Sequence, residues 1–404
     1  MKIAIVAPLF EHIPPTKYGG TERIIHYLVE QLVALGHSVT LYATDGSQTS
    51  AKLVPCYSGT LREHGIGSKP EDTERIYTAQ VKLACSAVPA HDIVHIHHGL
   101  YPYHPALLET ITNIPFVWTD HNAVHNDGKP EIIDRLLRLG IKLTALSDSH
   151  RNTVPLAPWT ATIHHGLPVN LLNAKPADPS YLAFLGRISP EKGICDAIWI
   201  ANRAKIQLKI AAKVDAVDRL FYEKDVKPLL EQLDAEYIGE VTEDEKGPFL
   251  SAAKALIFPI CWEEPFGLVM IEAMACGCPV IAFKRGSVPE IIEDGVTGFI
   301  VETREEACEA IQKLPQLDRQ YIRKRFEERF VSTLMAEKYV EAYKASIEAF
   351  KNTHNPLALA GLRPSLQSRR STAASALIHQ VSMKDSVNNK VYEKPLTAYT
   401  ARII

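Results

Sequence analysis

The stretch from Ala255 to Phe283 constrains the fold more than any other part of the chain. It begins with a short apolar run typical of a buried parallel strand, and a loop with Pro265 and Gly267 follows. The residues from Leu268 to Cys276 are helical in content, and Gly277 is suited to end that helix before another apolar run. Strand, helix and strand in this order predict a parallel sheet covered by helices.

Two strand–loop–helix series place this stretch in a larger plan. The chain opens with a β-branched run at Lys2–Pro8, a loop that contains two glycines, and an amphipathic helix over Thr21–Leu35. A second series starts at Tyr181, after a polar segment with two prolines. Two such series predict two doubly wound, Rossmann-like α/β domains that face each other across a cleft.

The domain boundaries follow from this division. We place the first domain at residues 1–165 and the second at residues 173–328. A helix is predicted over residues 329–350, because apolar side chains recur every four residues from Val331 to Ile347. Residues 351–404 have no sustained periodicity and are rich in Ser, Asn, Thr and Arg, which predicts a mobile tail or appendage.

Composition excludes several classes of protein. The net charge of −3 provides no basic field, so no nucleic-acid partner is expected. The seven cysteines are odd in number and scattered, which indicates a reducing compartment. No apolar run reaches the ~18 residues of a membrane span. We therefore expect a cytoplasmic protein whose membrane contact, at the inner face, is at most peripheral.

Two carboxylates, Glu264 and Glu272, bracket the predicted junction of loop and helix, with seven residues between them. In a continuous helix they would lie about 12 Å apart along the axis. A glycosidase pair needs a separation of roughly 5 to 9.5 Å, so that reaction is disfavoured. Acceptors this far apart suit a clamp on a long polyhydroxylated ligand, and the helix start between them suits an anion. The alternative is an ordinary strand–loop–helix unit with two surface glutamates.

The sequence E-P-F-G-L-V-M-I-E resembles the E-x7-E signature of retaining glycosyltransferases of family 4, which have the GT-B fold. The resemblance implies that Glu264, with Phe266, Gly267 and Leu268, binds the donor sugar, and that Glu272 holds the ribose. It also implies that the first domain lies on the acceptor side and the second binds the nucleotide sugar. The helix at 329–350 would then cross back to the first domain.

Arg187 and Lys192 come from G-R-I-S-P-E-K-G, between a predicted strand and a helix that we expect to start at Pro190. Two cations at a helix start can converge on one anion together with backbone N–H groups. In the family that this motif resembles, the pair binds the donor diphosphate. A salt-bridged surface loop is the alternative.

Three other places match the resemblance. Gly19 and Gly20 follow the first strand, and in the family such a pair faces the donor phosphate; a flexible turn is the alternative. His121, in W-T-D-H-N, matches a histidine beside the donor sugar; the alternative is a loop histidine bonded to its neighbours. Gly239, Glu240 and Val241 match a loop that meets the base, and a solvated acidic turn explains them equally well.

The sequence therefore predicts a retaining glycosyltransferase that moves a sugar from a UDP-glucose-like or GDP-mannose-like donor. The acceptor would be a carbohydrate, a lipid-linked molecule or a small molecule. His121, Glu264, Arg187 and Lys192 are the expected catalytic residues. No cofactor or metal is expected, because the chain has no D-x-D triplet and the cations can replace a metal at the departing phosphate.

Three alternatives remain at this point. A nucleotide-sugar epimerase or a phosphorylase could use the same fold, and product analysis with and without an acceptor separates them from a transferase. A catalytically silent sugar-nucleotide binding module would show a broken cation pair or glutamate pair, and neither pair is broken. A nicotinamide dehydrogenase is disfavoured because the first loop lacks G-x-G-x-x-G.

Overall fold

The computed structural model describes residues 1–16, 19–66, 70–87, 89–99, 114–122, 130–172 and 178–353. Most of these residues belong to one compact unit, Met1–Ile347. The appendage expected at 351–404 lies outside the described residues, apart from 351–353, which continue a helix.

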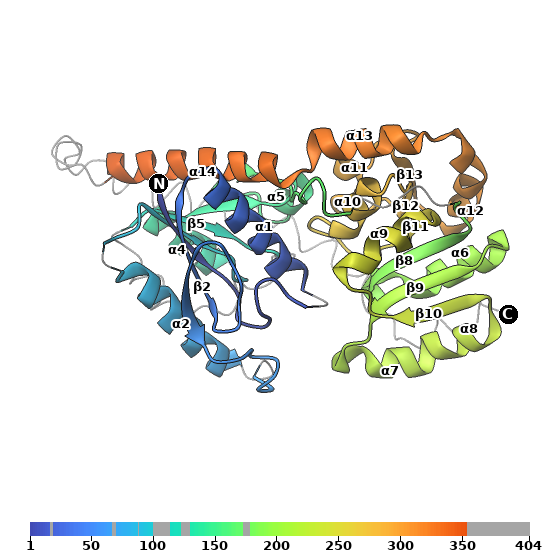
Figure 1. The fold of residues 1–404 in the computed structure, drawn as a ribbon, viewed down its shortest axis with the longest axis horizontal. Coiled ribbons are helices and arrows are strands. Elements are labelled where there is room, and N and C mark those ends of the chain that lie inside the picture. Colours follow the sequence, from blue (N-terminus) through green and yellow to red (C-terminus); the bar gives the residue numbers. More distant parts are fainter. Residues whose placement is uncertain are drawn as a thin grey trace. The chain divides into compact units, whose positions relative to one another are not determined.

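The first sheet has seven parallel strands within the described residues, in the order β3-β2-β1-β4-β5-β6-β7. Figure 1 labels β2 and β5 of this sheet. Their bounds are β1 Lys2–Val6, β2 Ser38–Thr44, β3 Lys52–Tyr57, β4 Ile93–Ile96, β5 Phe116–Thr119, β6 Lys142–Ala145 and β7 Trp159–Thr162. The order reverses direction beside β1, and ligands of doubly wound sheets bind at such a point, beyond the carboxyl ends of the strands.

The second sheet repeats this plan with six parallel strands among the described residues, in the order β10-β9-β8-β11-β12-β13. Their bounds are β8 Tyr181–Arg187, β9 Leu208–Lys213, β10 Ala235–Gly239, β11 Ala253–Phe258, β12 Val280–Phe283 and β13 Gly298–Val301. The prediction of two parallel α/β sheets is confirmed. The sequence analysis had not assigned the edge strands β3 and β13, because half-exposed edges carry a weaker apolar pattern than central strands.

Alternate residues of each central strand face two different layers of helices. In β1, Ile3 and Ile5 pack with α1, whereas Ala4 and Val6 pack with α2 on the other face. In the second sheet α6 and α12 cover one face, and α9, α10 and α13 cover the other. The helix bounds are α1 Gly20–Ala34, α2 Pro70–Cys85, α4 Pro130–Leu139, α5 Asp148–Thr153, α6 Ile194–Ala204, α7 Arg219–Phe221, α8 Lys227–Gln232, α9 Glu243–Ser251, α10 Leu268–Ala275, α11 Val288–Ile291, α12 Arg304–Lys313, α13 Arg319–Arg329 and α14 Ser332–Thr353.

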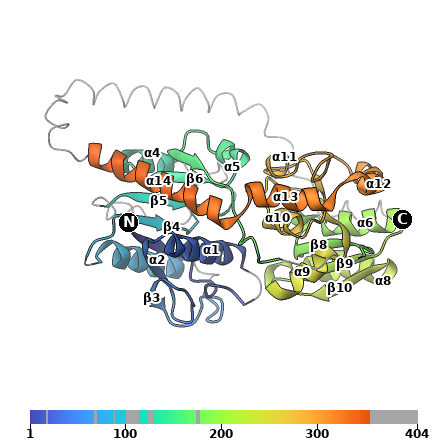
Figure 2. The same ribbon diagram turned by 45° about the horizontal axis from the view of Figure 1, so that its top comes forward.

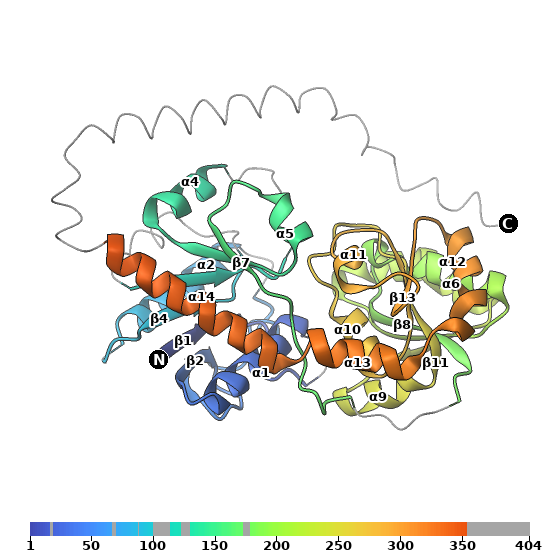
Figure 3. The same cartoon turned by 90° about the horizontal axis from the view of Figure 1, so that it is seen from above.

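The last helix, α14, starts at Ser332, three residues after the predicted start at 329, and runs alongside the first sheet (Figures 2 and 3). Its apolar stripe is buried at Met335, Tyr339 and Tyr343. The Tyr343 hydroxyl lies 2.7 Å from His95 Nδ1 at the end of β4, so the helix makes polar as well as apolar contacts with this sheet.

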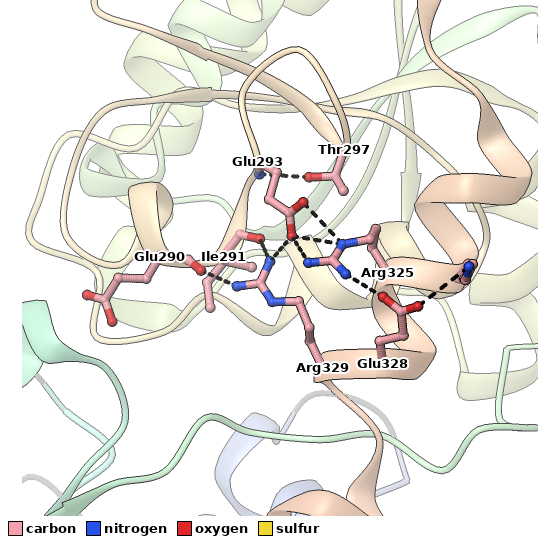
Figure 4. Close-up of polar contacts among 8 residues, drawn as sticks. Glu290, Ile291, Glu293, Thr297, Arg325, Glu328 and Arg329 are labelled. Carbon is pink, nitrogen blue, oxygen red and sulfur yellow. Dashed lines mark hydrogen bonds and ion pairs between the residues drawn. The ribbon is translucent and has the colours of Figure 1, made fainter.

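An ionic network holds α13 just before the chain enters α14 (Figure 4). Arg325 and Arg329 donate to the Glu293 carboxylate at 2.7 and 2.6 Å, and Arg329 also donates to the backbone oxygen of Glu290 at 2.6 Å. The Glu290 carboxylate in turn accepts hydrogen bonds from the backbone N–H groups of Asp148 and Ser149, both at 2.7 Å. Glu290 of α11 therefore links the second sheet's region to the start of α5.

Candidate active site

A cavity of about 800 Å³ is lined by residues that follow strands of both sheets. It brings together twelve of the predicted site residues: Gly19, Gly20, His121, Arg187, Lys192, Glu240, Val241, Glu264, Phe266, Gly267, Leu268 and Glu272. Gly239 ends β10 next to this lining but does not contribute to it.

Glycines bring the backbone close to the cavity at two helix starts. Gly267 precedes α10 with φ +78°, a left-handed conformation that favours glycine. A Cβ added at Gly20, the first residue of α1, would lie 3.2 Å from Leu268 Cδ1. The start of α1 and the start of α10 therefore adjoin each other at the cavity. The first N–H groups of a helix have no partner within the helix, so each start is suited to an anion.

Arg187 ends β8 and is surrounded by carboxylates. Its guanidinium pairs with Glu191, four residues on, and lies 3.4 Å from Asp218 and 3.9 Å from Asp215. The cation is thus held at the cavity by anions that a diphosphate could replace.

Lys192 lies in a short 3-10 turn, Pro190–Lys192, and α6 starts only at Ile194, so the predicted helix start at Pro190 was wrong by one turn. Its ammonium lies 2.5 Å from Glu264 Oε2 and 5.1 Å from the centre of the Trp262 ring. The Trp262 Nε1–H donates to the same Glu264 oxygen at 3.0 Å. Lys192 and Glu264, predicted for separate tasks, are therefore direct partners.

Glu272 is 3% exposed in the middle of α10 and pairs with Lys246 of α9 at 2.6 Å. Lys246 lies 3.5 Å from Glu243, which pairs with Arg23 of α1. The sequence analysis missed Lys246 and Arg23, since neither belongs to a motif and only packing brings them to the cavity.

Three histidines, His97, His121 and His165, lie together on the side of the cavity nearest the first sheet, and we call them the histidine wall. His121 and His165 line the cavity directly. His121 follows β5, and its Nε2 lies 3.0 Å from Nδ1 of His97, which follows β4. Its ring stacks on His165 with centroids 5.2 Å apart and an interplanar angle of 15°. His165 meets the Phe266 ring edge-on at 4.8 Å. Burial, with a smaller effect of His150, lowers the pKa of His121 to about 3, so the imidazole is neutral at pH 7.

Comparisons with known proteins agree with this architecture. Residues 173–330 match the family described as Glycosyl transferases group 1, and residues 18–181 match the one described as Glycosyltransferase Family 4. The glycogen synthase of Mycobacterium tuberculosis is 24% identical over 387 residues, covering 81% of this chain and 92% of that protein. The chain is a glycosyltransferase with the GT-B fold.

Solved structures share the fold of this glycosyltransferase. Sucrose-phosphate synthase from Thermosynechococcus elongatus has a TM-score of 0.66 and 20% identity, covering 86% of this chain and all of that one (100%). Anabaena HepE, solved in complex with UDP-glucose, has a TM-score of 0.64 and 17% identity, covering 85% of this chain and 100% of that one.

The glycosyltransferase has a further buried acid in the cavity lining, Glu22, in the first turn of α1. It is 6% exposed, and burial is the main cause that raises its pKa to about 7. Its position two residues after the Gly19–Gly20 pair was the signal that could have found it.

In the described part of the glycosyltransferase, no helix is both long and apolar enough to cross a membrane. All seven cysteines lie in that part and all are free thiols.

Proposed function

We propose that this enzyme is a retaining, metal-independent glycosyltransferase of family 4 that uses its E-x7-E segment to bind a nucleoside diphosphate sugar. One observation carries the proposal: Arg187, Lys192, Glu264 and Glu272 line a single cavity together with Gly19 and Gly20. Four charged groups from two separate segments of the chain converge there, which a set of unrelated surface residues would not do.

The charges divide the cavity into regions that match the parts of such a donor. The diphosphate fits between Arg187, Lys192 and the N–H groups at the start of α1. Glu264 and the backbone from Phe266 to Leu268 then adjoin the sugar, and Glu272 adjoins the ribose. Glu240 and Val241, which follow Gly239 at the end of β10, would then contact the base.

The chemistry follows from where charge develops. As the sugar–phosphate bond breaks, negative charge grows on the diphosphate, and Arg187 and Lys192 stabilise it in place of a metal. Glu264 exchanges its ion pair with Lys192 for sugar hydroxyls, and His121 lies beside the sugar as a neutral group. For retention, the acceptor attacks from the face of the leaving group, and a phosphate oxygen takes its proton.

The donor and acceptor are proposed by class. A uridine donor that carries glucose comes first, supported by the complex of HepE with UDP-glucose, and a guanosine donor that carries mannose comes second. The acceptor is a carbohydrate, a lipid-linked molecule or a small molecule. The free thiols favour a reducing, cytoplasmic location, with membrane contact at most peripheral.

A panel of nucleotide sugars tests the proposal. Thermal shift with UDP-glucose, GDP-mannose and their free nucleotides should find at least one stabilising donor, because a ligand that binds the folded state raises the midpoint. That donor is then incubated with candidate sugars, and the products are separated and their anomers determined. A retained anomer in a new glycoside is expected. Epimerised donor without any glycoside, or binding without turnover, would refute the proposed reaction.

A further inference from the structure

We propose that His97 is a positioning residue: it fixes the tautomer of His121, so that His121 carries its proton on Nδ1 and faces the transferred sugar as a hydrogen-bond donor. This inference rests on the proposed function for what His121 contacts, and on geometry alone for the tautomer.

His97 is held rigidly at the end of β4. Its backbone N–H donates to Val6 O at 3.0 Å, and its ring is 1% exposed and lies 3.9 Å from the ring of His95, centre to centre. Both nitrogens of His95 have partners of their own, Tyr343 Oη at 2.7 Å and Thr119 Oγ1 at 2.8 Å. The His95 ring therefore packs against the His97 ring but forms no ring-nitrogen hydrogen bond with it.

The two nitrogens of His97 differ in their surroundings. Nδ1 lies 3.0 Å from His121 Nε2, whereas Nε2 is buried and has no hydrogen-bond partner among the described residues. An orphaned buried N–H is rarer in proteins than an orphaned acceptor, so the bare nitrogen is Nε2. Nδ1 then carries the proton and donates it to His121 Nε2, which leaves the His121 proton on Nδ1.

A charged pair is excluded by the neighbours of His97. Burial lowers the pKa of His97 well below its usual range, and the groups that act on it, His95, His121, His98 and His165, push in the same direction. The two rings are therefore both neutral, and a single proton between them decides the role of each.

This arrangement matters for transfer because a neutral N–H donor can bind a sugar oxygen without opposing the nearby cations. A histidine with the reverse tautomer would present a lone pair to the sugar instead. Fixing one tautomer in advance removes the cost of reorganising it during the reaction.

The direct test is nitrogen NMR of the full chain labelled with ¹⁵N-histidine, with His121→Gln used to assign the His121 signals. The Nδ1–H tautomer is expected to dominate for His121 in the wild type and to lose that dominance in His97→Phe. A dominant Nε2–H tautomer in the wild type would overturn the inference. This measurement needs no activity, so it separates failure of the inference from failure of the proposed function.

Kinetics supply the second test, with UDP-glucose and GDP-mannose each assayed for nucleotide release. His97→Phe should lower kcat about 10- to 100-fold and change KM less than about 3-fold, as for partners that orient a catalytic group. His97→Asn, which restores an N–H near the place of Nδ1, should recover most of kcat.

His98→Phe is the matched control, because it removes a buried histidine of the same segment that bonds Ala7 O at 3.0 Å. It should lower the thermal midpoint without the loss of kcat. Equal kcat in His97→Phe and His98→Phe, or no recovery in His97→Asn, would overturn the inference.

Discussion

The two sides of the cavity differ in how they hold their polar groups. On the side of the second sheet, Arg187, Lys192, Glu264 and Glu272 are ionic, and each has an oppositely charged partner. On the side of the first sheet, charged residues such as Arg23 also line the cavity, but beside them lies a wall of imidazoles that bond and stack on one another, and burial keeps His121 neutral. The difference indicates a division of labour, because paired ions can exchange partners for a charged ligand, whereas a neutral wall binds hydroxyls without repelling the cations.

The largest expected effect is on the rate of transfer, when a residue of the ionic side is replaced. Lys192→Ala and Glu272→Ala should each lower the rate of transfer by about 100- to 1000-fold, because under the proposed function each removes a group that stabilises or holds the donor. Steady-state rates with the donor from the panel measure this.

Matched controls are Lys224→Ala and Glu309→Ala, both at exposed positions away from the cavity. They should retain wild-type rates, and all four variants should unfold cooperatively. Near-normal turnover in both site variants would remove the ionic side from the mechanism.

The next largest effect is a loss of stability at acid pH, where His121 of the histidine wall resists protonation in the folded state. The folded pKa of His121 is about 3 against an ordinary 6.5, so the unfolded chain takes up a proton first as pH falls. Stability from this group is nearly complete above pH 6.5 and decreases by about 2 kcal/mol between pH 6.5 and 4.5. Denaturant unfolding of wild type and His121→Gln at pH 6.5, 5.5 and 4.5 measures the difference, and parallel curves would contradict a neutral buried His121.

Glu22 should make stability depend on pH in the opposite direction to His121, because its pKa is raised in the fold and that of His121 is lowered. Its folded pKa is about 7 against an ordinary 4.5, so its stability contribution is complete below pH 4.5 and is lost as pH rises through 7. The loss amounts to at most about 3 kcal/mol. Glu22→Gln should therefore gain stability relative to wild type as pH rises from 4.5 to 8, in the same unfolding assay. An unchanged difference across that range would show that Glu22 is ionised in the fold.

The smallest effect concerns the support of the wall by α14. Tyr343→Phe removes the hydroxyl that lies 2.7 Å from His95 Nδ1 and should lower the free energy of unfolding by about 1–2 kcal/mol. Tyr321→Phe, on α13 and 42% exposed, is the control and should stay within about 0.5 kcal/mol of wild type. Equal stability of the two variants would show that α14 does not support the wall through this contact.

Much of the ionic side could be predicted from the sequence because its residues lie in short motifs with local causes. The glycines that permit tight turns, the strand before each loop and the helix after it are all visible as neighbours in the chain. The same reasoning predicted an anion site at Arg187 and Lys192, which both line the cavity, although it started the helix one turn too early.

The partners could not be predicted in the same way. Lys246 meets Glu272 from another helix, and His97 meets His121 from another strand, 24 residues away. His165 lines the cavity and stacks on His121, which lies 44 residues away in the sequence.

The sequence by itself determined the parallel sheets and the motif residues, because side-chain periodicity and glycine conformation act between near neighbours. Only the tertiary structure decided which ions pair and which imidazoles touch, because the order of strands in a sheet brings distant segments together. The residues of the ionic side can therefore largely be predicted from the sequence, whereas the contacts of the histidine wall arise only when the chain folds.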